Sequence, residues 1–169
     1  PRIVVRPTVQ TPAVLAGVFM GLALLTKGPV AGLLWVLTIG GIWVVNRFGN
    51  LLSFRQLLAF GFTTLVVAAT WFGLEFYQHG FWFFEQFITY QIRLFSTPDS
   101  GHGQPFYYHF VVVLIGCFPA SIFAIRYLTT FSKEGGFASW LFMLFWVVMI
   151  LFSIVTTKIV HYSSMAWYP

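Results

Sequence analysis

Five apolar stretches, each about as long as a membrane is thick, constrain this chain more than any other feature. They cover residues 7–26, 28–45, 57–76, 106–125 and 137–156. A helix of about 20 residues crosses a hydrocarbon core about 30 Å thick. Because 59% of the residues are hydrophobic and 8% are charged, a soluble domain of this size could not bury the apolar surface. We predict an all-α fold, a polytopic transmembrane helix bundle with about five spanning helices.

The ends of the chain indicate an internal piece of a longer membrane protein. The first residue is Pro1, no signal-peptide pattern follows it, and residues 163–169 resemble the start of another helix. We found no soluble domain and no tandem repeat, so we expect residues 1–169 to form a single transmembrane domain fragment. Cys117 is the single cysteine of the sequence, which excludes an internal disulfide. Its place in an apolar run favours a packing role.

The distribution of positive charge predicts the orientation of the bundle. One side carries Arg2, Arg6, Arg47, Arg55, Arg126 and Lys133, and the other carries Lys27, Arg93 and Lys158. Because cytoplasmic loops are enriched in Lys and Arg, we expect the first side to be cytoplasmic. Lys27 and residues 77–104 and 158–161 would then face outside the cytoplasm.

The first two apolar stretches are predicted to form a tight hairpin. Ala13, Gly17 and Gly21 recur every four residues in the first stretch, and Gly28 and Gly32 have the same spacing in the next, which lets two helix backbones approach closely.

Lys27 and Pro29 lie at the turn of this hairpin. Pro29 suits the first turn of a helix, and with Lys27 the free amides there would attract an anion. The alternative is a turn whose lysine extends into the lipid headgroups.

Residues 80–95 are predicted to form an amphipathic helix in the membrane interface. Glu85, Thr89 and Arg93 recur every four residues among phenylalanine and isoleucine side chains. The segment is too short and too polar to span.

Polar residues gather between Glu75 and His109, which hold three of the four carboxylates and three of the four histidines. Within this region, Gly101 and Gly103 flank His102, and Tyr107 and Tyr108 follow at the predicted headgroup depth. In a hydrophobic chain such a cluster indicates a wet loop or a site at the membrane surface, and we favour the site. The alternative is a solvated loop with an aromatic belt.

A second polar group ends the fifth stretch, where Lys158 and His161 are three residues apart and would share one helix face. A lysine that extends to the headgroups is the alternative here as well.

Segments 21–31, 101–108 and 158–162, in this order, resemble the transmembrane region of the PMT-type integral-membrane glycosyltransferases. This family includes bacterial aminoarabinose transferases and dolichyl-phosphate-mannose-protein mannosyltransferase-like proteins. The resemblance implies a GT-C fold in the bacterial inner membrane. It also implies a polyprenyl-phosphate-linked sugar donor, sugar transfer on the extracytoplasmic side, and a lipid, glycan or protein acceptor. Membrane lipids are expected partners, and nucleic acid is not.

The resemblance also implies roles for individual residues. The donor phosphate would be bound by Lys27, Arg93, His102, Lys158 and His161, and Tyr107 and Tyr108 would line the donor site. His102 would act as a hydrogen-bond donor or as ligand to a divalent metal ion, the cofactor that this resemblance implies. The family's catalytic carboxylate lies in a first outer loop absent from this chain. Because Glu75, Glu85 and Asp99 do not match it, we assign no catalytic residue here.

Two other classes of protein fit parts of the pattern. Buried charges and a Gly-Pro break also mark a membrane transporter or channel with an outward-facing anion site. The polar residues here are predicted to gather at one membrane face, whereas a translocation path needs them near the midplane. A purely structural bundle would leave the His102 loop without a role.

Overall fold

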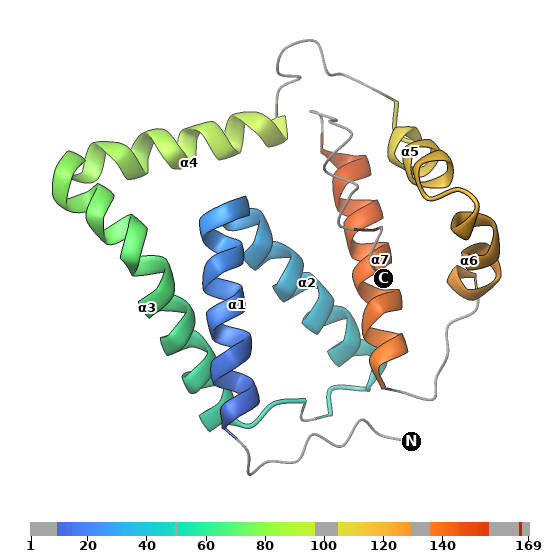
Figure 1. Cartoon of the computed structure of the whole chain (residues 1–169), viewed down its shortest axis with the longest axis horizontal. Helices are drawn as coiled ribbons and strands as arrows, with labels where there is room; N and C mark the ends of the chain where they lie inside the picture. Colours follow the sequence, from blue (N-terminus) through green and yellow to red (C-terminus); the bar gives the residue numbers. More distant parts are fainter. Residues whose placement is uncertain (1–9, 50, 97–104, 130–135, 156–165, 167–169) are drawn as a thin grey trace. The chain divides into compact units, whose positions relative to one another are not determined.

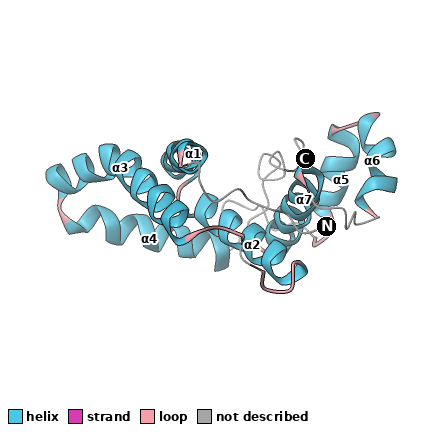
Figure 2. Ribbon diagram, turned by 90° about the horizontal axis from the view of Figure 1, so that it is seen from below, coloured by secondary structure: helices cyan, strands magenta, loops and turns pink. Residues whose placement is uncertain are grey.

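The computed structural model describes residues 10–49, 51–96, 105–129, 136–155 and 166, and within these ranges all regular secondary structure is helical (Figures 1 and 2). The helices are α1 (Thr11–Lys27), α2 (Pro29–Val45), α3 (Phe54–His79), α4 (Phe81–Ser96), α5 (Tyr108–Gly116), α6 (Ala120–Leu128) and α7 (Phe137–Ile154). The all-α prediction is therefore confirmed for the described part of the chain.

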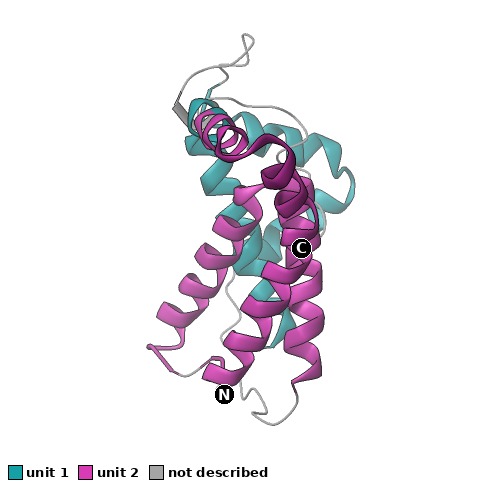
Figure 3. Ribbon diagram, turned by 90° about the vertical axis from the view of Figure 1, so that its left-hand side faces the viewer, with its two compact units in different colours: residues 1, 90–169 teal, residues 2–89 magenta. Residues whose placement is uncertain are grey.

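The chain divides into two compact units, which Figure 3 shows in different colours. Unit 2 covers residues 2–89 and contains α1, α2, α3 and the first half of α4. Unit 1 covers residues 90–169, together with residue 1, and contains the end of α4 and helices α5 to α7. We describe each unit by itself.

Two of the described helices, α3 and α7, are long and apolar enough to cross a membrane. Helices α1 and α2 are apolar but have 17 residues each. Large apolar side chains such as Phe19 on α1, Phe62 and Leu65 on α3, and Phe123 on α6 are exposed. An apolar surface of this extent is typical of helices that contact lipid or further protein.

The small residues of α1 pack against α3. The prediction that they pack against the second apolar stretch, which forms α2, was wrong. A Cβ atom on Gly17 would lie 2.6 Å from the carbonyl oxygen of Phe60, and one on Gly21 would lie 2.5 Å from Cβ of Val67. Thr64 also donates a hydrogen bond from its hydroxyl to the Gly17 carbonyl, at 3.2 Å. The α1–α2 contact is smaller. The small residues predicted a close backbone approach, but their spacing does not specify which helix approaches.

The residue predicted to face α1 across the hairpin, Gly32, makes only ordinary contacts. A Cβ atom there would lie 3.7 Å from Cδ2 of Leu24. Helix α2 instead meets α3 through the stacked rings of Trp35 and Phe60, whose centroids are 4.6 Å apart. The first two helices are thus joined by a short turn without being closely packed.

Helix α3 begins three residues before the apolar stretch that predicted it, because Ser53 and Gln56 form a capping box. The Gln56 N–H donates to the Ser53 hydroxyl at 3.3 Å, and the Ser53 N–H donates to Oε1 of Gln56 at 3.0 Å. These bonds satisfy amides that a helix start leaves free. The helix ends at Gly80, whose φ of 63° is accessible to glycine.

The amphipathic helix predicted for residues 80–95 is confirmed as α4. Figure 1 shows a sharp corner between α3 and the start of α4, and Gly80 is the residue between the two helices. Phe72 of α3 contacts the rings of Phe83, Phe84 and Phe87 on α4, with centroids 5.6 to 6.5 Å apart. The phenylalanine face of α4 thus packs on α3.

The fourth apolar stretch was predicted as one continuous span, and this prediction was wrong. Helix α5 ends at Gly116 and α6 begins at Ala120. Each of the two helices has nine residues. Pro119 has no N–H to donate, and its ring clashes with the helix geometry that would precede it. The hydroxyl of Ser121 donates to the Leu114 carbonyl at 2.7 Å, which satisfies a backbone group at the break.

Helix α7 supplies the core of unit 1. Its buried side chains include Phe145, Val148, Met149 and Phe152, and Val113 of α5 is buried as well. The indole N–H of Trp146 donates to the Leu128 carbonyl at 3.2 Å and ties α7 to the end of α6.

Candidate functional site

The structure describes four of the seven residues predicted to bind or line the donor. Lys27 ends α1 in unit 2, while Arg93 lies in the last turn of α4 and Tyr107 and Tyr108 lie at the start of α5, in unit 1. The other three, His102, Lys158 and His161, lie outside the described residues, so their predicted roles stay predictions.

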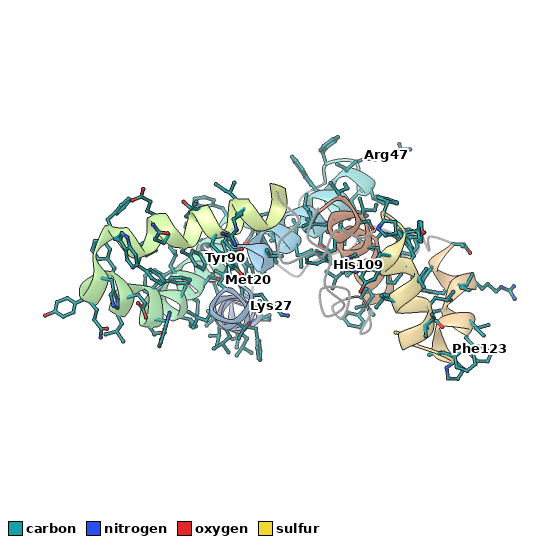
Figure 4. All side chains as sticks on the ribbon, turned by 90° about the horizontal axis from the view of Figure 1, so that it is seen from above. Met20, Lys27, Arg47, Tyr90, His109 and Phe123 are labelled. Carbon is teal, nitrogen blue, oxygen red and sulfur yellow. The ribbon has the colours of Figure 1, made fainter. Side chains whose placement is uncertain are left out.

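Lys27 is exposed at the C-terminal end of α1, where Figure 4 labels it. A helix C-terminus carries partial negative charge, so this position stabilises a protonated ammonium. Next to it, the hydroxyl of Thr26 donates to the carbonyls of Leu22 and Ala23, at 3.1 Å each.

The start of α2 offers fewer amides for an anion than the sequence suggested. Pro29 occupies the first helical position, as predicted, and has no N–H. The Gly28 N–H donates to the Leu24 carbonyl at 2.9 Å, and the Ala31 N–H donates to the Gly28 carbonyl at 3.2 Å. Among the first-turn donors, this leaves the Val30 N–H. Anion binding at this corner would therefore depend chiefly on Lys27.

The polar stripe of α4 has the exposure that its spacing predicted. Glu85, Thr89 and Arg93 are all exposed, whereas Phe83 and Phe87 on the opposite face are half-buried. The guanidinium of Arg93 therefore belongs to a solvent- or headgroup-facing surface of the helix.

The two tyrosines at the start of α5 differ in environment. Tyr107 precedes the helix and is exposed, while Tyr108 is half-buried with its ring edge-on to His109 at 5.3 Å. An exposed tyrosine at a helix start suits the headgroup region or the wall of a lipid-binding site.

His109 is a buried polar residue to which the sequence assigned no role. Its side chain is 0% exposed, and its ring lies 6.2 Å from that of Phe152, where α5 faces α7 (Figure 4). The signal that could have identified it is its spacing of four residues from the buried Val113.

His79 and Glu75 form an ion pair at the end of α3, with Nδ1 and Oε2 3.0 Å apart. The His79 side chain is 50% exposed, and an exposed i, i+4 pair contributes little to stability. This pair gives His79 a local role unrelated to a donor phosphate.

No group of three or more His, Cys, Asp or Glu side chains in the described part of the chain could hold a metal ion. His102 lies outside that part, so the metal role implied for it stays a prediction, and we derive no step that depends on a metal.

An apolar cavity of about 640 Å³ lies between α5, α6 and α7 in unit 1. Its lining includes Val113, Leu114, Cys117, Phe123, Trp146 and Met149. The half-buried Cys117 thus lines an apolar space, as its predicted packing role requires.

The chain resembles one curated protein over most of its length. It is 26% identical over 163 residues to the undecaprenyl phosphate-alpha-4-amino-4-deoxy-L-arabinose arabinosyl transferase of Pectobacterium carotovorum subsp. carotovorum (strain PC1). The match covers 92% of this chain and 28% of that protein, so the chain spans less than a third of its relative's length. No family model and no solved structure matches the chain. The similarity is consistent with a distant relationship to membrane glycosyltransferases.

Proposed function

We propose that this chain is part of the transmembrane region of a glycosyltransferase. The intact enzyme would move a sugar from a polyprenyl-phosphate-linked donor to a lipid, glycan or protein acceptor on the extracytoplasmic side of the bacterial inner membrane. The similarity to an arabinosyl transferase over 92% of the chain carries this proposal. The helical fold and the exposed apolar surfaces of the helices support a membrane location.

The proposed reaction gives the exposed cations of this chain a role, because negative charge develops on the leaving group. An acceptor hydroxyl attacks the anomeric carbon and loses its proton, while the bond from that carbon to the phosphate oxygen breaks. The leaving polyprenyl phosphate gains negative charge, which fixed positive groups in a partly dry site stabilise. In our proposal Lys27 and Arg93 supply positive charge from the described residues, and His102, Lys158 and His161 complete the site. We assign no residue of this chain as the base that accepts the proton.

A transfer assay on the full-length protein tests this function. Vesicles containing the enzyme, a polyprenyl-phosphate-linked sugar and an acceptor should release polyprenyl phosphate and glycosylated acceptor in equal amounts. His102→Ala should lower the rate about tenfold or more, because a hydrogen bond to a charged group is lost. His79→Ala is the matched control and should change the rate little, since His79 pairs with Glu75. Equal, mild effects of the two substitutions would contradict a role for the His102 loop.

Chelation separates the two roles that His102 could have. With a metal role, a chelator should inhibit the parent enzyme and added Zn²⁺ or Mn²⁺ should restore it. With a hydrogen-bonding role, the chelator should leave the rate unchanged while His102→Ala still weakens donor binding.

A transporter is the second candidate, and the break between α5 and α6 favours it. Interrupted helices in transporters place backbone groups around a substrate or ion. Here, however, the hydroxyl of Ser121 donates a hydrogen bond to the Leu114 carbonyl at the break. The cavity next to the break is mostly apolar. The break therefore lacks the polar surroundings that a transported ion would need, and we retain the transferase proposal.

The predicted orientation can be tested with two cysteines on α3 and its preceding loop, in a Cys117→Ala background. Both Gln78 and Leu52 are exposed, and they lie near opposite ends of α3, whose 26 residues extend about 39 Å. With the predicted topology, Gln78→Cys should react with an impermeant maleimide in intact cells, and Leu52→Cys should react only after permeabilisation. The reverse pattern would place Lys27 on the cytoplasmic side and contradict the proposed site.

A further inference from the structure

The connection from the end of α2 to the start of α3 has an unusual backbone. Arg47 and Phe48 both have positive φ, 53° and 61°, a conformation that residues with a Cβ atom rarely adopt. The Phe48 N–H donates to the Trp43 carbonyl at 2.9 Å, and the two rings meet edge-on with centroids 4.9 Å apart. This arrangement fixes the Phe48 ring against the end of α2 and leaves Arg47 exposed (Figure 4).

Within unit 2, positive charge at this end has no nearby carboxylate to balance it. Arg47 and Arg55 are both exposed, and no Asp or Glu precedes Glu75 in the sequence. Glu75 lies 20 residues after Arg55 on the same helix, which corresponds to about 30 Å. Arg55 is also the second residue of α3, where the helix dipole favours an anion over a cation. The local field at this end of unit 2 therefore attracts negative charge from outside the unit.

Apolar side chains accompany the two arginines. Trp43, Phe48, Leu52 and Phe54 are exposed, Phe48 by 62% and Phe54 by 73%. Figure 1 shows that α1 begins, α2 ends and α3 begins at this same end of unit 2. Aromatic side chains next to Arg at the end of apolar helices are typical of the headgroup level of a membrane.

We propose that residues 43–55, which we call the basic rim, bind the phosphates of anionic phospholipid headgroups. Arg47 and Arg55 pair with the phosphates, and Trp43, Phe48 and Phe54 insert among the adjoining glycerol and acyl groups. A zwitterionic headgroup has no net charge and attracts the arginines less strongly, so the rim selects lipids with net negative charge. This inference concerns a surface separate from the proposed donor site and does not depend on the reaction.

Native mass spectrometry of the full-length protein in detergent tests the proposal, with added phosphatidylglycerol or phosphatidylcholine as the probe. Phosphatidylglycerol should bind more tightly. Arg47→Gln or Arg55→Gln should each weaken its binding about fivefold, and both together about 30-fold, because each arginine near an anionic lipid makes a comparable contribution. Binding of phosphatidylcholine should not change.

The control is Arg126→Gln, which removes an exposed arginine from the last turn of α6 in unit 1. It should retain at least half of the parent affinity for phosphatidylglycerol. The circular dichroism spectrum of the double variant shows whether it has kept its helices. Parent-like lipid binding by a folded double variant, or an equal loss in Arg126→Gln, would overturn the proposal.

Discussion

Replacing Lys27 by alanine in the full-length enzyme should slow sugar transfer about 100-fold, since one fixed charge contact to the leaving group is lost. From the structure we expect the transfer rate to depend more strongly on Lys27 than the sequence alone suggests. Pro29 has no N–H, and the Gly28 and Ala31 amides are already bonded within the chain, so few backbone donors remain to replace the ammonium. The rate is measured as polyprenyl phosphate released per enzyme molecule, with the amount of inserted protein determined in the same membranes.

Two further variants show whether the effect is specific. Lys27→Arg keeps a cation at the end of α1 and should retain a larger part of the rate. Arg126→Ala removes an exposed cation from the last turn of α6 and should change the rate little. Near-normal turnover in Lys27→Ala would mean that the lysine only anchors the turn in the headgroups.

Alanine at Gly17 and Gly21 should separate α1 from α3 and destabilise the full-length protein. The new Cβ atoms would lie 2.6 Å from the backbone oxygen of Phe60 and 2.5 Å from Cβ of Val67, and neither atom can move without its helix. Overpacking of this kind costs about 1–3 kcal/mol for each substitution. The hydrogen bond from Thr64 to Gly17 would lengthen as well. The midpoint of unfolding by SDS in mixed micelles, followed by circular dichroism, should shift to lower SDS.

Gly73→Ala is the matched control on α3, because a Cβ atom there meets nothing within 4 Å in the described structure. It should leave the midpoint unchanged or raise it slightly, since alanine favours a helix by up to about 1 kcal/mol over glycine. If the variants at Gly17 and Gly21 behave like the one at Gly73, the α1–α3 contact is not close-packed.

Local features of the fold could be predicted from the sequence, because they depend on neighbouring residues. Pro29 at the start of α2, the start of α4 next to Gly80 and the exposed stripe of α4 all follow from a few consecutive residues. The capping box of Ser53 and Gln56 has an equally local signature, and using it would have placed the start of α3 correctly. Pro119 is an equally local indication that the fourth stretch does not form one continuous helix.

Partners across the fold could not be predicted in the same way. The spacing of Gly17 and Gly21 indicates that a backbone approaches, but choosing between α2 and α3 depends on the shapes of Thr64 and Val67, which lie more than 40 residues away. For the candidate site, the sequence placed Lys27 at a helix end and Tyr107 at a helix start, both as observed. The spacing of four residues between His109 and Val113 indicates that they share a helix face, but that α7 covers this face depends on tertiary packing.

The unequal lengths of the helices in unit 2 create a hydrophobic mismatch. Helices α1 and α2, with 17 residues each, are about 26 Å long, whereas α3 is about 39 Å long. The hydrocarbon core of a bilayer is about 30 Å thick, so α3 must tilt or protrude while the α1–α2 pair falls a few ångströms short. The bilayer thins around that pair, or the turn after α1 lies below the headgroups and the ammonium of Lys27 reaches them along its flexible stem. Membrane thickness thereby controls how far the ammonium of Lys27 has to extend to reach a phosphate group at the level of the headgroups.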